Sequence, residues 1–297
     1  MHLKNVTEHK KKPERTRMPF LKNHHNPFYS DDDLGTPMLI VKLGGSILTD
    51  KKKKDCYREN VMKRLAKEIQ QAQIPLILVH GAGSFGHILA KEYRLNEGYK
   101  EKSQLRGFSL THAKVQTLNS LVLQALHDQG IPAVSLSPHA FLQLDNHNLA
   151  TIDITIFDSY LEKGFIPVTF GDVALDRTLG FSICSGDLLI QVLSSYFKPE
   201  KVVFVIDEDG LYTANPKTDS HAKFIESITN EELGHLTTAA NKHADVTEGM
   251  KGKINTIQRI AHMGIDTVVV NGNKPKRLYN TLVGKETTCT RIRGVKP

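Results

Sequence analysis

Short apolar runs alternate with longer amphipathic segments along the chain from residue 38 onward. The runs have the length of strands, and the segments between them have the length and apolar spacing of helices. This alternation predicts an α/β fold, a three-layer αβα sandwich in which helices cover both faces of a mainly parallel central sheet. The expected strands are 39–43, 76–79, 131–136, 165–170, 202–206, 267–270 and 287–292. The expected helices are 58–71, a segment after the glycine-rich turn at 81–86, and 104–129, 186–196 and 250–262.

Two further short runs, 141–144 and 149–152, flank the polar residues 145–148. These residues read Asp-Asn-His-Asn, a turn composition, so the segment predicts a small hairpin flap. We find no internal repeat and no clean linker after residue 36. We therefore expect one domain over 37–297, built on a single compact sheet with two functional halves.

The first 36 residues are polar and show no sustained apolar period, which predicts a disordered basic extension. Acidic residues at Glu8, Glu14 and 31–33 argue against a transit peptide, because such segments avoid acids. Residues 1–22 carry +5 of the net charge of +7. The rest of the chain is therefore nearly balanced in charge.

Composition narrows the class of partner. The nearly neutral body lacks tryptophan and lacks the basic stripe with stacking aromatics that nucleic-acid binding needs, so we expect anionic small molecules as partners. The longest apolar runs are far shorter than the roughly 20 residues of a membrane span, so we expect no membrane partner. The cysteines Cys56, Cys184 and Cys289 form no CxxC pair, which favours a reducing cytoplasm.

The chain contains 14 histidines, which raises the question of a metal site. His80 and His87 are seven residues apart across a glycine turn, unlike the i, i+4 spacing of zinc ligands on a helix. We expect no metal ligand from protein side chains.

Two glycine-rich turns follow the first two expected strands. Residues 42–46 read Lys-Leu-Gly-Gly-Ser, and residues 80–87 read His-Gly-Ala-Gly-Ser-Phe-Gly-His. A strand, a glycine turn and a helix start together form an anion site, because bare backbone N–H groups and the positive end of the helix dipole meet there. Two such turns indicate two phosphorylated ligands, or a phosphoryl donor and its acceptor.

The second turn leaves two other interpretations open, a dinucleotide site and a purely structural turn. Gly81, Gly83 and Gly86 fit the GxGxxG fingerprint, which expects an acidic residue about 20 positions on. This chain instead reads Leu-Arg-Gly-Phe at 105–108. It also contains no P-loop and no protein-kinase motif set. Phosphate binding therefore has to come from other residues.

Four segments, in order, resemble the amino acid kinase family: 41–46, 185–187, 207–212 and 249–253. They read Val-Lys-Leu-Gly-Gly-Ser, Ser-Gly-Asp, Asp-Glu-Asp-Gly-Leu-Tyr and Gly-Met-Lys-Gly-Lys. The resemblance extends over nearly all of 38–293. Within the family, residues 80–87 together with 45–51 are similar to the isopentenyl phosphate kinase branch, whose members make isopentenyl diphosphate from isopentenyl phosphate and ATP. Fosfomycin kinases are similar at the same histidine.

The resemblance implies ATP as phosphoryl donor, Mg²⁺ carried mainly by the nucleotide, and a homodimer. Two anions must meet, and two unit charges at 4 Å repel by about 4 kcal/mol at an effective dielectric of 20, so cations are the expected machinery. By resemblance, Lys42 and Lys253 would hold the β- and γ-phosphates, with Lys51 nearby. Asp187 would orient the two lysines rather than act as a base. His87 would bind the phosphate of the acceptor.

The remaining site residues are implied in the same way, with the acceptor in the N-terminal half and the nucleotide in the C-terminal half. The expected ATP-binding residues are Lys42, Gly44, Gly45, Ser46, Gly83, Asp207, Tyr212, Gly249 and Lys253. The expected acceptor-binding residues are Ala82, Gly83, His87 and Gly186. The spacing from Gly249 favours Lys253 over its neighbour Lys251.

One departure from the family and two other functions stay open. Residues 247–250 read Thr-Glu-Gly-Met where the family reads Thr-Gly-Gly-Met, so Glu248 would either weaken ATP binding or point outward. The first alternative function is a kinase for fosfomycin or another small phosphonate or phosphate monoester. The second is a nucleotide-binding regulator that has lost turnover.

Overall fold

The structure is a computed structural model that describes residues 38–50, 53–242 and 248–295. The expected disordered extension over 1–36 and the candidate Lys51 lie outside the described residues. Within the described ranges, no helix combines the length and apolar character needed to cross a membrane.

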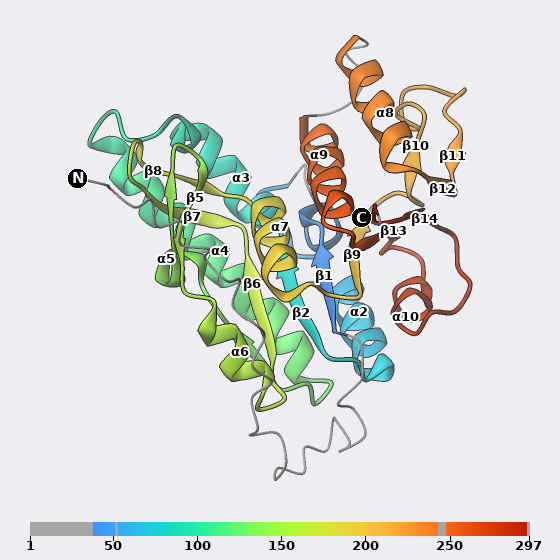
Figure 1. Cartoon of the computed structure of the whole chain (residues 1–297). Helices are drawn as coiled ribbons and strands as arrows, with labels where there is room; N and C mark the ends of the chain where they lie inside the picture. The colour runs from blue at the N-terminus through green and yellow to red at the C-terminus, as the bar shows by residue number, and fades with distance from the viewer. Residues whose placement is uncertain (1–37, 51–52, 243–247, 296–297) are drawn as a thin grey trace, which may run out of the picture.

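An eight-stranded sheet forms the centre of the molecule (Figure 1). Its strand order is β12-β14-β13-β9-β1-β2-β6-β3. Strands β13 and β14 pair antiparallel, and all other neighbouring strands of this sheet pair parallel. The mainly parallel sheet expected from the sequence is confirmed. The strands are β1 (Leu39–Leu43), β2 (Leu76–His80), β3 (Ala133–Ser135), β6 (Ile166–Phe170), β9 (Lys201–Ile206), β12 (Ser227–Ile228), β13 (Asp266–Asn271) and β14 (Cys289–Ile292).

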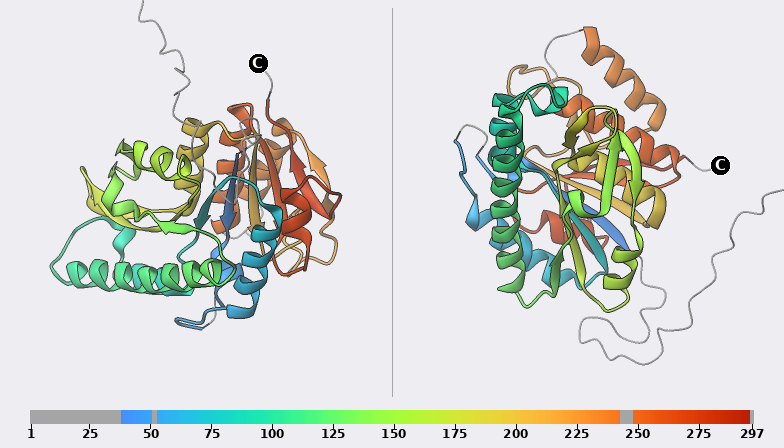
Figure 2. Two further views of the ribbon diagram at one scale, coloured as in Figure 1. Left: turned by 90° about the horizontal axis from the view of Figure 1, so that it is seen from below. Right: turned by 90° about the vertical axis from the view of Figure 1, so that its left-hand side faces the viewer.

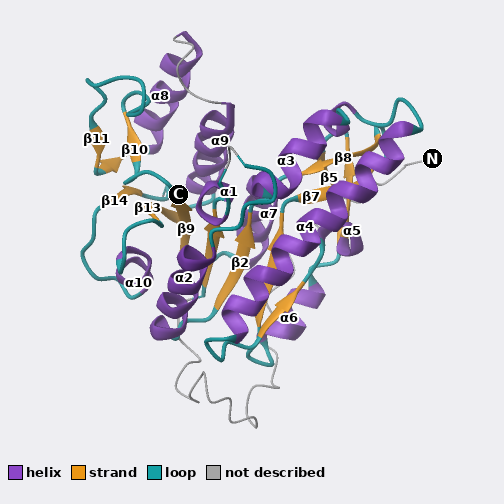
Figure 3. Ribbon diagram, turned by 180° about the vertical axis from the view of Figure 1, so that it is seen from behind, coloured by secondary structure: helices purple, strands orange, loops and turns teal. Residues whose placement is uncertain are grey.

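Helices cover both faces of this sheet, which confirms the three-layer sandwich (Figures 2 and 3). Side chains alternate across a strand, and β1 shows the result: Ile40 belongs to the core under one helix layer, whereas Leu39 and Val41 belong to the core under the other. The layer on the Ile40 face contains α6 (Thr155–Leu161), α7 (Gly186–Phe197) and α9 (Glu248–His262), with α8 (Asn230–Lys242) packed on α9. The opposite layer contains α2 (Glu59–Ala72), α4 (Ser103–His127) and α10 (Arg277–Leu282).

The carboxyl ends of β1 and β9 mark a topological switch point. The chain builds outward from β1 to β2 and later returns to the other side of β1 as β9. Open α/β sheets bind ligands in the crevice at such a point, beyond the carboxyl ends of the strands. Two helices begin at this edge, α1 (Gly45–Leu48) after β1 and α3 (Gly83–Glu92) after β2. The fold therefore brings both glycine turns to one place.

A second sheet of four strands, in the order β5-β4-β7-β8, lies at the side of the molecule (Figure 1). The expected hairpin is confirmed as β4 (Leu142–Asp145) and β5 (Asn148–Ile152). The expectation of a single sheet is wrong, because the hairpin joins β7 (Asp172–Asp176) and β8 (Gly180–Cys184). Polar residues at both ends of β7, Asp172 and Asp176, are buried here. These two polar residues interrupt the apolar pattern that would predict a strand, so β7 was not expected.

The other expected elements agree with the structure to within a few residues. The strand expected at 131–136 is shorter, because Pro132 lacks an N–H and lies just before β3. The helix expected at 250–262 begins two residues earlier, at Glu248. The sequence pattern did not indicate α6, α8, α10 or β12. It also did not indicate the short elements η2 (Leu95–Glu97), α5 (Pro138–Phe141), β10 (Leu211–Tyr212) and β11 (Phe224–Ile225).

Candidate active site

The two glycine turns meet backbone to backbone at the switch point. A Cβ atom added to Gly45 would lie 2.8 Å from the backbone nitrogen of Gly83, so no side chain fits there. Gly83 itself has a φ of +51°, a conformation that favours glycine. The spacing of these glycines is therefore required by the close approach of the two turns.

Thr49 holds the two turns together. Its Oγ1 donates a hydrogen bond to the Gly45 carbonyl at 2.8 Å and accepts one from the backbone N–H of Ser84 at 2.9 Å. The side chain is 1% exposed, so both bonds are shielded from water. No sequence motif marks this residue, because its role depends on a contact between segments 35 residues apart.

Lys42, Asp187 and Lys253 converge at the carboxyl edge of the sheet. Lys42 is on β1, on the strand face that meets α7 and α9, and its Nζ lies 2.8 Å from Oδ1 of Asp187. The Nζ of Lys253, on α9, lies 3.9 Å from the same oxygen. The side chains of the two lysines are only 7% and 12% exposed. The expected arrangement, one carboxylate between two lysines, is present in the structure.

Local structure explains why Asp187 lies at this point. Ser185 caps α7, and its side chain accepts a hydrogen bond from the N–H of Leu188 at 3.1 Å. Asp187 is therefore in the first turn of the helix, where the helix dipole favours negative charge. Gly186 leaves room for the neighbouring lysine, since a Cβ there would lie 3.1 Å from Cε of Lys42.

The charge of Asp187 is maintained by its neighbours. Burial would raise the pKa of this carboxyl, but Lys42 and Lys253 oppose that effect and the net shift of the pKa is downward. His87 contributes in the same direction, so its imidazole lies within electrostatic reach of the same carboxylate. Asp187 is thus an ionised anchor for the lysines and a poor proton acceptor.

The ring of Phe204 lies beneath both lysines. The Nζ atoms of Lys42 and Lys253 are 5.8 and 5.7 Å from its centroid, within the range of a cation–π contact. Phe204 is directly opposite Lys42 in the pairing of β1 with β9. The sequence predicts the strand that carries this residue, but register between distant strands is not visible in the sequence.

A cavity of about 420 Å³ opens above this cluster. Most of the described site residues expected from the sequence line it, whereas Tyr212 does not. Lys253 lines the cavity and Lys251 is exposed outside it, as the spacing from Gly249 favoured. The expected residues on its wall are Lys42, Gly44, Gly45, Ser46, Ala82, Gly83, His87, Gly186, Asp187, Asp207 and Lys253.

The two sides of the cavity differ in chemistry. On the β2 side, α3 carries His87 together with the apolar residues Ile88 and Ala90. On the β9 side, Asp207 follows the strand and accepts hydrogen bonds from Ser46 Oγ at 2.8 Å and Lys217 Nζ at 3.0 Å. The cavity can therefore hold one partly apolar and one polar ligand, with the lysine pair on the wall they share.

His80, the other histidine of the second turn, belongs to the core. It is fully buried, its ring stacks on Phe170 with centroids 5.2 Å apart, and its Nε2 lies 3.2 Å from Oδ1 of Asn119. Burial lowers the pKa of His80 and favours its neutral form. Only His87 of this pair lines the cavity.

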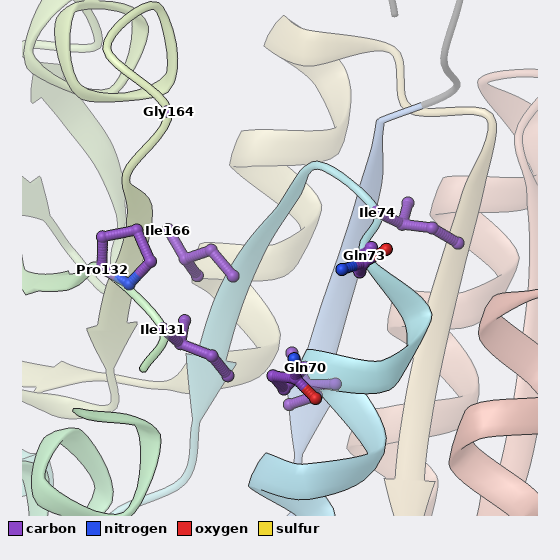
Figure 4. A pocket seen from close by; sticks show the side chains of 8 residues that line it. Gln70, Gln73, Ile74, Ile131, Pro132, Gly164 and Ile166 are labelled. Carbon is purple, nitrogen blue, oxygen red and sulfur yellow. The ribbon is translucent and has the colours of Figure 1, made fainter. Parts of the chain in front are cut away.

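A second, much smaller hollow lies at the opposite end of the strands (Figure 4). It measures about 20 Å³ and is lined by residues such as Ile131, Ile166 and Gln70. This volume is close to that of one water molecule, and no charged side chain lines the hollow. It does not compete with the large cavity as a ligand site.

Comparison with known proteins gives a consistent result. A model of the amino acid kinase family matches residues 37–271. The isopentenyl phosphate kinase of Methanothermobacter thermautotrophicus is 42% identical, over 86% of this chain and 99% of its own. That of Arabidopsis thaliana is 29% identical, over 78% and 86%.

Solved structures agree with the sequence relatives. A crystal structure of isopentenyl phosphate kinase with 39% identity superposes with a TM-score of 0.76, covering 86% of this chain and 99% of the other. A product complex of the T. acidophilum enzyme, 28% identical, superposes with a TM-score of 0.73 over 86% and 100%. With a family model matched over most of its length and a relative this similar, the chain belongs to the amino acid kinase family and, within it, to the isopentenyl phosphate kinases.

Proposed function

We propose that this protein transfers the γ-phosphoryl group of ATP directly to isopentenyl phosphate, giving isopentenyl diphosphate and ADP. An oxygen of the acceptor phosphate forms the new bond to the γ-phosphorus, and the bond from that phosphorus to the β-γ bridging oxygen breaks. The acceptor phosphate is already ionised near neutral pH, since its second pKa is about 6. No general base is required, which agrees with the engagement of Asp187 by two lysines.

The observation that carries this proposal is the position of His87 on the same cavity as the Lys42–Asp187–Lys253 cluster. Two phosphates must come into contact, and their repulsion amounts to several kcal/mol in a site of low dielectric. The two lysines offer positive charge to the donor and to the moving phosphoryl group. His87 offers a separate donor to the phosphate of the acceptor.

The apolar part of the wall supports an acceptor with a short hydrocarbon tail. Beyond His87, the cavity is lined by Ile88, Ala90, Val115 and Ile183. Burial of such a tail stabilises binding by roughly 0.8 kcal/mol per methylene group. We assign Ala82, Gly83 and Gly186 to the acceptor phosphate in the same proposal.

The nucleotide is assigned to the β9 side. Gly44, Gly45, Ser46 and Gly83 would offer backbone or hydroxyl donors to its phosphates, and Asp207, Tyr212 and Gly249 would contact the rest of the molecule. Lys51 is kept as a further phosphate ligand by resemblance. This division retains the expectation that the N-terminal half binds the acceptor and the C-terminal half the nucleotide.

Mg²⁺ would be held mainly by the nucleotide. Two carboxylates on the cavity wall next to the lysine cluster and the nucleotide side already have partners: Asp187 pairs with the lysines, and Asp207 with Ser46 and Lys217. When bound, the ion would neutralise part of the charge of the phosphates.

A comparison of acceptors tests the proposal. ADP release is measured with isopentenyl phosphate, dimethylallyl phosphate, geranyl phosphate and fosfomycin, each at several concentrations with MgATP. We expect the highest kcat/KM with isopentenyl phosphate. A higher kcat/KM with fosfomycin would instead identify the protein as a phosphonate kinase. No turnover with any acceptor would indicate a nucleotide-binding regulator.

A homodimer located in the cytoplasm completes the proposal, on the basis of the family resemblance. Size-exclusion chromatography with light scattering should give twice the mass of one chain. A mass equal to that of one chain at micromolar concentration would contradict the dimer and leave the proposed reaction intact.

A further inference from the structure

Three potential metal ligands come together beside the cavity from distant parts of the sequence. They are His112 on α4, His139 on α5 and Asp172 at the start of β7. One ligand atom from each lies within 4.8 Å of the others. The elements that carry them are packed together, with α4 and α5 both in contact with β7 (Figures 1 and 3).

The distances suit a small ion. Oδ2 of Asp172 lies 2.7 Å from Nδ1 of His112 and 3.9 Å from Nδ1 of His139. A tetrahedral Zn²⁺ ion with bonds of about 2.1 Å needs ligand atoms roughly 3.4 Å apart. One observed distance is shorter than that value and the other is longer, so side-chain rotations would have to bring the ligand atoms to the required spacing.

The surroundings of Asp172 call for a cation. Its side chain is fully buried, and a buried carboxylate is costly unless it is paired. Within the described part of the chain its ion-pair partners are the two histidines, and no Lys or Arg pairs with it. Its other oxygen, Oδ1, accepts a hydrogen bond from the N–H of Val173 at 2.8 Å, which orients the carboxylate.

The two histidine side chains are partly exposed, so an ion can reach them from solvent. Their side chains are 28% and 40% exposed, so the cluster is open to solvent. Nδ1 of His139 lies 3.0 Å from Ser137 Oγ, which accepts a hydrogen bond from Gln116 Nε2 at 2.7 Å. The Ser137 hydroxyl can therefore donate its own proton to Nδ1, which identifies Nδ1 as the nitrogen that carries the lone pair. A bound metal ion would take the place of that hydroxyl proton on Nδ1.

We propose that His112, His139 and Asp172 form a binding site for one divalent transition-metal ion, of which Zn²⁺ is the best match. Two imidazoles and one carboxylate are a common zinc ligand set with a fourth position left for water. The site would connect α4, α5 and β7. Because Asp172 also lines the large cavity, occupancy would fix one part of the cavity wall. The proposal departs from the expectation, based on the spacing of His80 and His87, that no side chain binds a metal.

Metal titration of the full chain tests the proposal independently of kinase activity. The protein is treated with a chelator, dialysed, and titrated with ZnCl₂ by calorimetry and with Co²⁺ by visible absorption. His139→Ala is the main variant, because an exposed side chain is removed with little risk to folding. His112→Ala and Asp172→Asn remove the other two ligands, and the exposed His221, on the β10–β11 segment, provides the matched control His221→Ala.

The result is read as the difference between variants, so that weak zinc binding by any of the other histidines, 14 in all, cancels out. We expect His139→Ala and His112→Ala each to lose one equivalent of zinc, or to weaken it more than about tenfold, the effect typical even of partners outside the ligand set. His221→Ala should match the wild type. Zinc should also raise the melting temperature of the wild type but not of His139→Ala. Either of two results would overturn the proposal: unchanged zinc stoichiometry and affinity in His139→Ala, or no zinc binding by the wild type. Asp172 would then be paired with a protonated His112 instead of a metal ion.

Discussion

At the scale of single residues, His87 is assigned to the acceptor alone. We expect His87→Ala to lower kcat/KM for isopentenyl phosphate by about 10²- to 10³-fold, the cost of removing one donor to a developing charge. ATP affinity should stay close to that of the wild type, because the lysine cluster is intact. Steady-state kinetics together with calorimetric titration of the nucleotide separate the two effects.

The conservative variants His87→Asn and His87→Gln serve as controls, since an amide can still donate a hydrogen bond. They should recover part of the lost activity. If His87→Ala turned over isopentenyl phosphate at a normal rate, the assignment of this side chain to the acceptor would be wrong.

Replacing Lys253 tests whether its ammonium group acts on the transferring phosphoryl group. If its ammonium group stabilises charge on the transferring phosphoryl group, Lys253→Met should lower kcat far more than it weakens binding of ADP, which lacks that group. The measurement is kcat from initial rates and the Kd of ADP from calorimetry.

Lys251→Met is the matched control on the same helix. Two residues on an α-helix are separated by about 200°, and Lys251 is exposed whereas Lys253 lines the cavity. Lys251→Met should therefore be nearly silent. Equal defects in both variants would indicate a diffuse electrostatic effect instead of a specific contact.

At the scale of elements, Thr49 connects the start of α1 to the start of α3. We expect Thr49→Val to destabilise the protein by about 1–3 kcal/mol, because the N–H of Ser84 loses its acceptor in a buried place. The KM for the acceptor should also rise, since the second glycine turn is no longer held. Denaturant unfolding and steady-state kinetics measure the two effects.

Thr49→Ser keeps the hydroxyl group and should retain most of the stability and acceptor affinity. If Thr49→Ser and Thr49→Val were equally impaired, the methyl group rather than the hydrogen bonds would be responsible.

Asp176 stabilises the four-stranded sheet through its two turns. Its carboxylate accepts backbone N–H bonds from Asn146 and His147 at the tip of one hairpin and from Leu179 at the tip of the other, and a hydroxyl bond from Ser182. Burial would raise the pKa of this group, but these bonds outweigh it and hold the pKa at about 2.

A pKa below the unfolded value means that the stabilisation is complete above the unfolded pKa and is lost as the pH falls through about 4 toward 2. We expect Asp176→Asn to lower the free energy of unfolding by about 2 kcal/mol near neutral pH, the usual worth of a hydrogen bond to a charged group. The difference from the wild type should be constant above about pH 5 and should shrink as the pH falls from about 5 toward 2 in urea unfolding. Asp145→Asn is the control, because that exposed residue accepts one bond from Thr178 Oγ1. A difference that did not change with pH would contradict this account.

At the scale of the whole molecule, the hydrophobic core of the described fold is built from β1 and the elements that follow it. Within the described part of the chain, residues from 38 onward provide a cavity wall, the lysine cluster and both helix layers, and the match to the family model begins at 37. We expect deletion of residues 1–36 to leave the melting temperature and kcat nearly unchanged, because that segment has little apolar content to bury. Thermal unfolding and initial rates of the truncated protein test this, and a loss of folding or of activity at equal concentration would refute it.

The sequence by itself determined seven strands of the central sheet, the β4–β5 hairpin, the helices α2, α3, α4, α7 and α9, and the order of the motifs. The apolar run of β1 is read correctly at both ends, because a strand buried on both faces leaves a continuous apolar signal. The glycine turns and the Ser-Gly-Asp start of α7 are equally local, since turn and cap chemistry act over a few residues. Lys42, His87, Asp187 and Lys253 could be named because motifs carry them.

Only the tertiary structure decided which distant residues meet. Phe204 lies under the lysines through strand register, and Thr49 bridges two turns through packing. The four-stranded sheet escaped the pattern because buried carboxylates such as Asp176 are polar in sequence yet satisfied by backbone N–H groups in space. His112, His139 and Asp172 share no motif and no spacing, since α4, α5 and β7 bring them together only when the chain has folded.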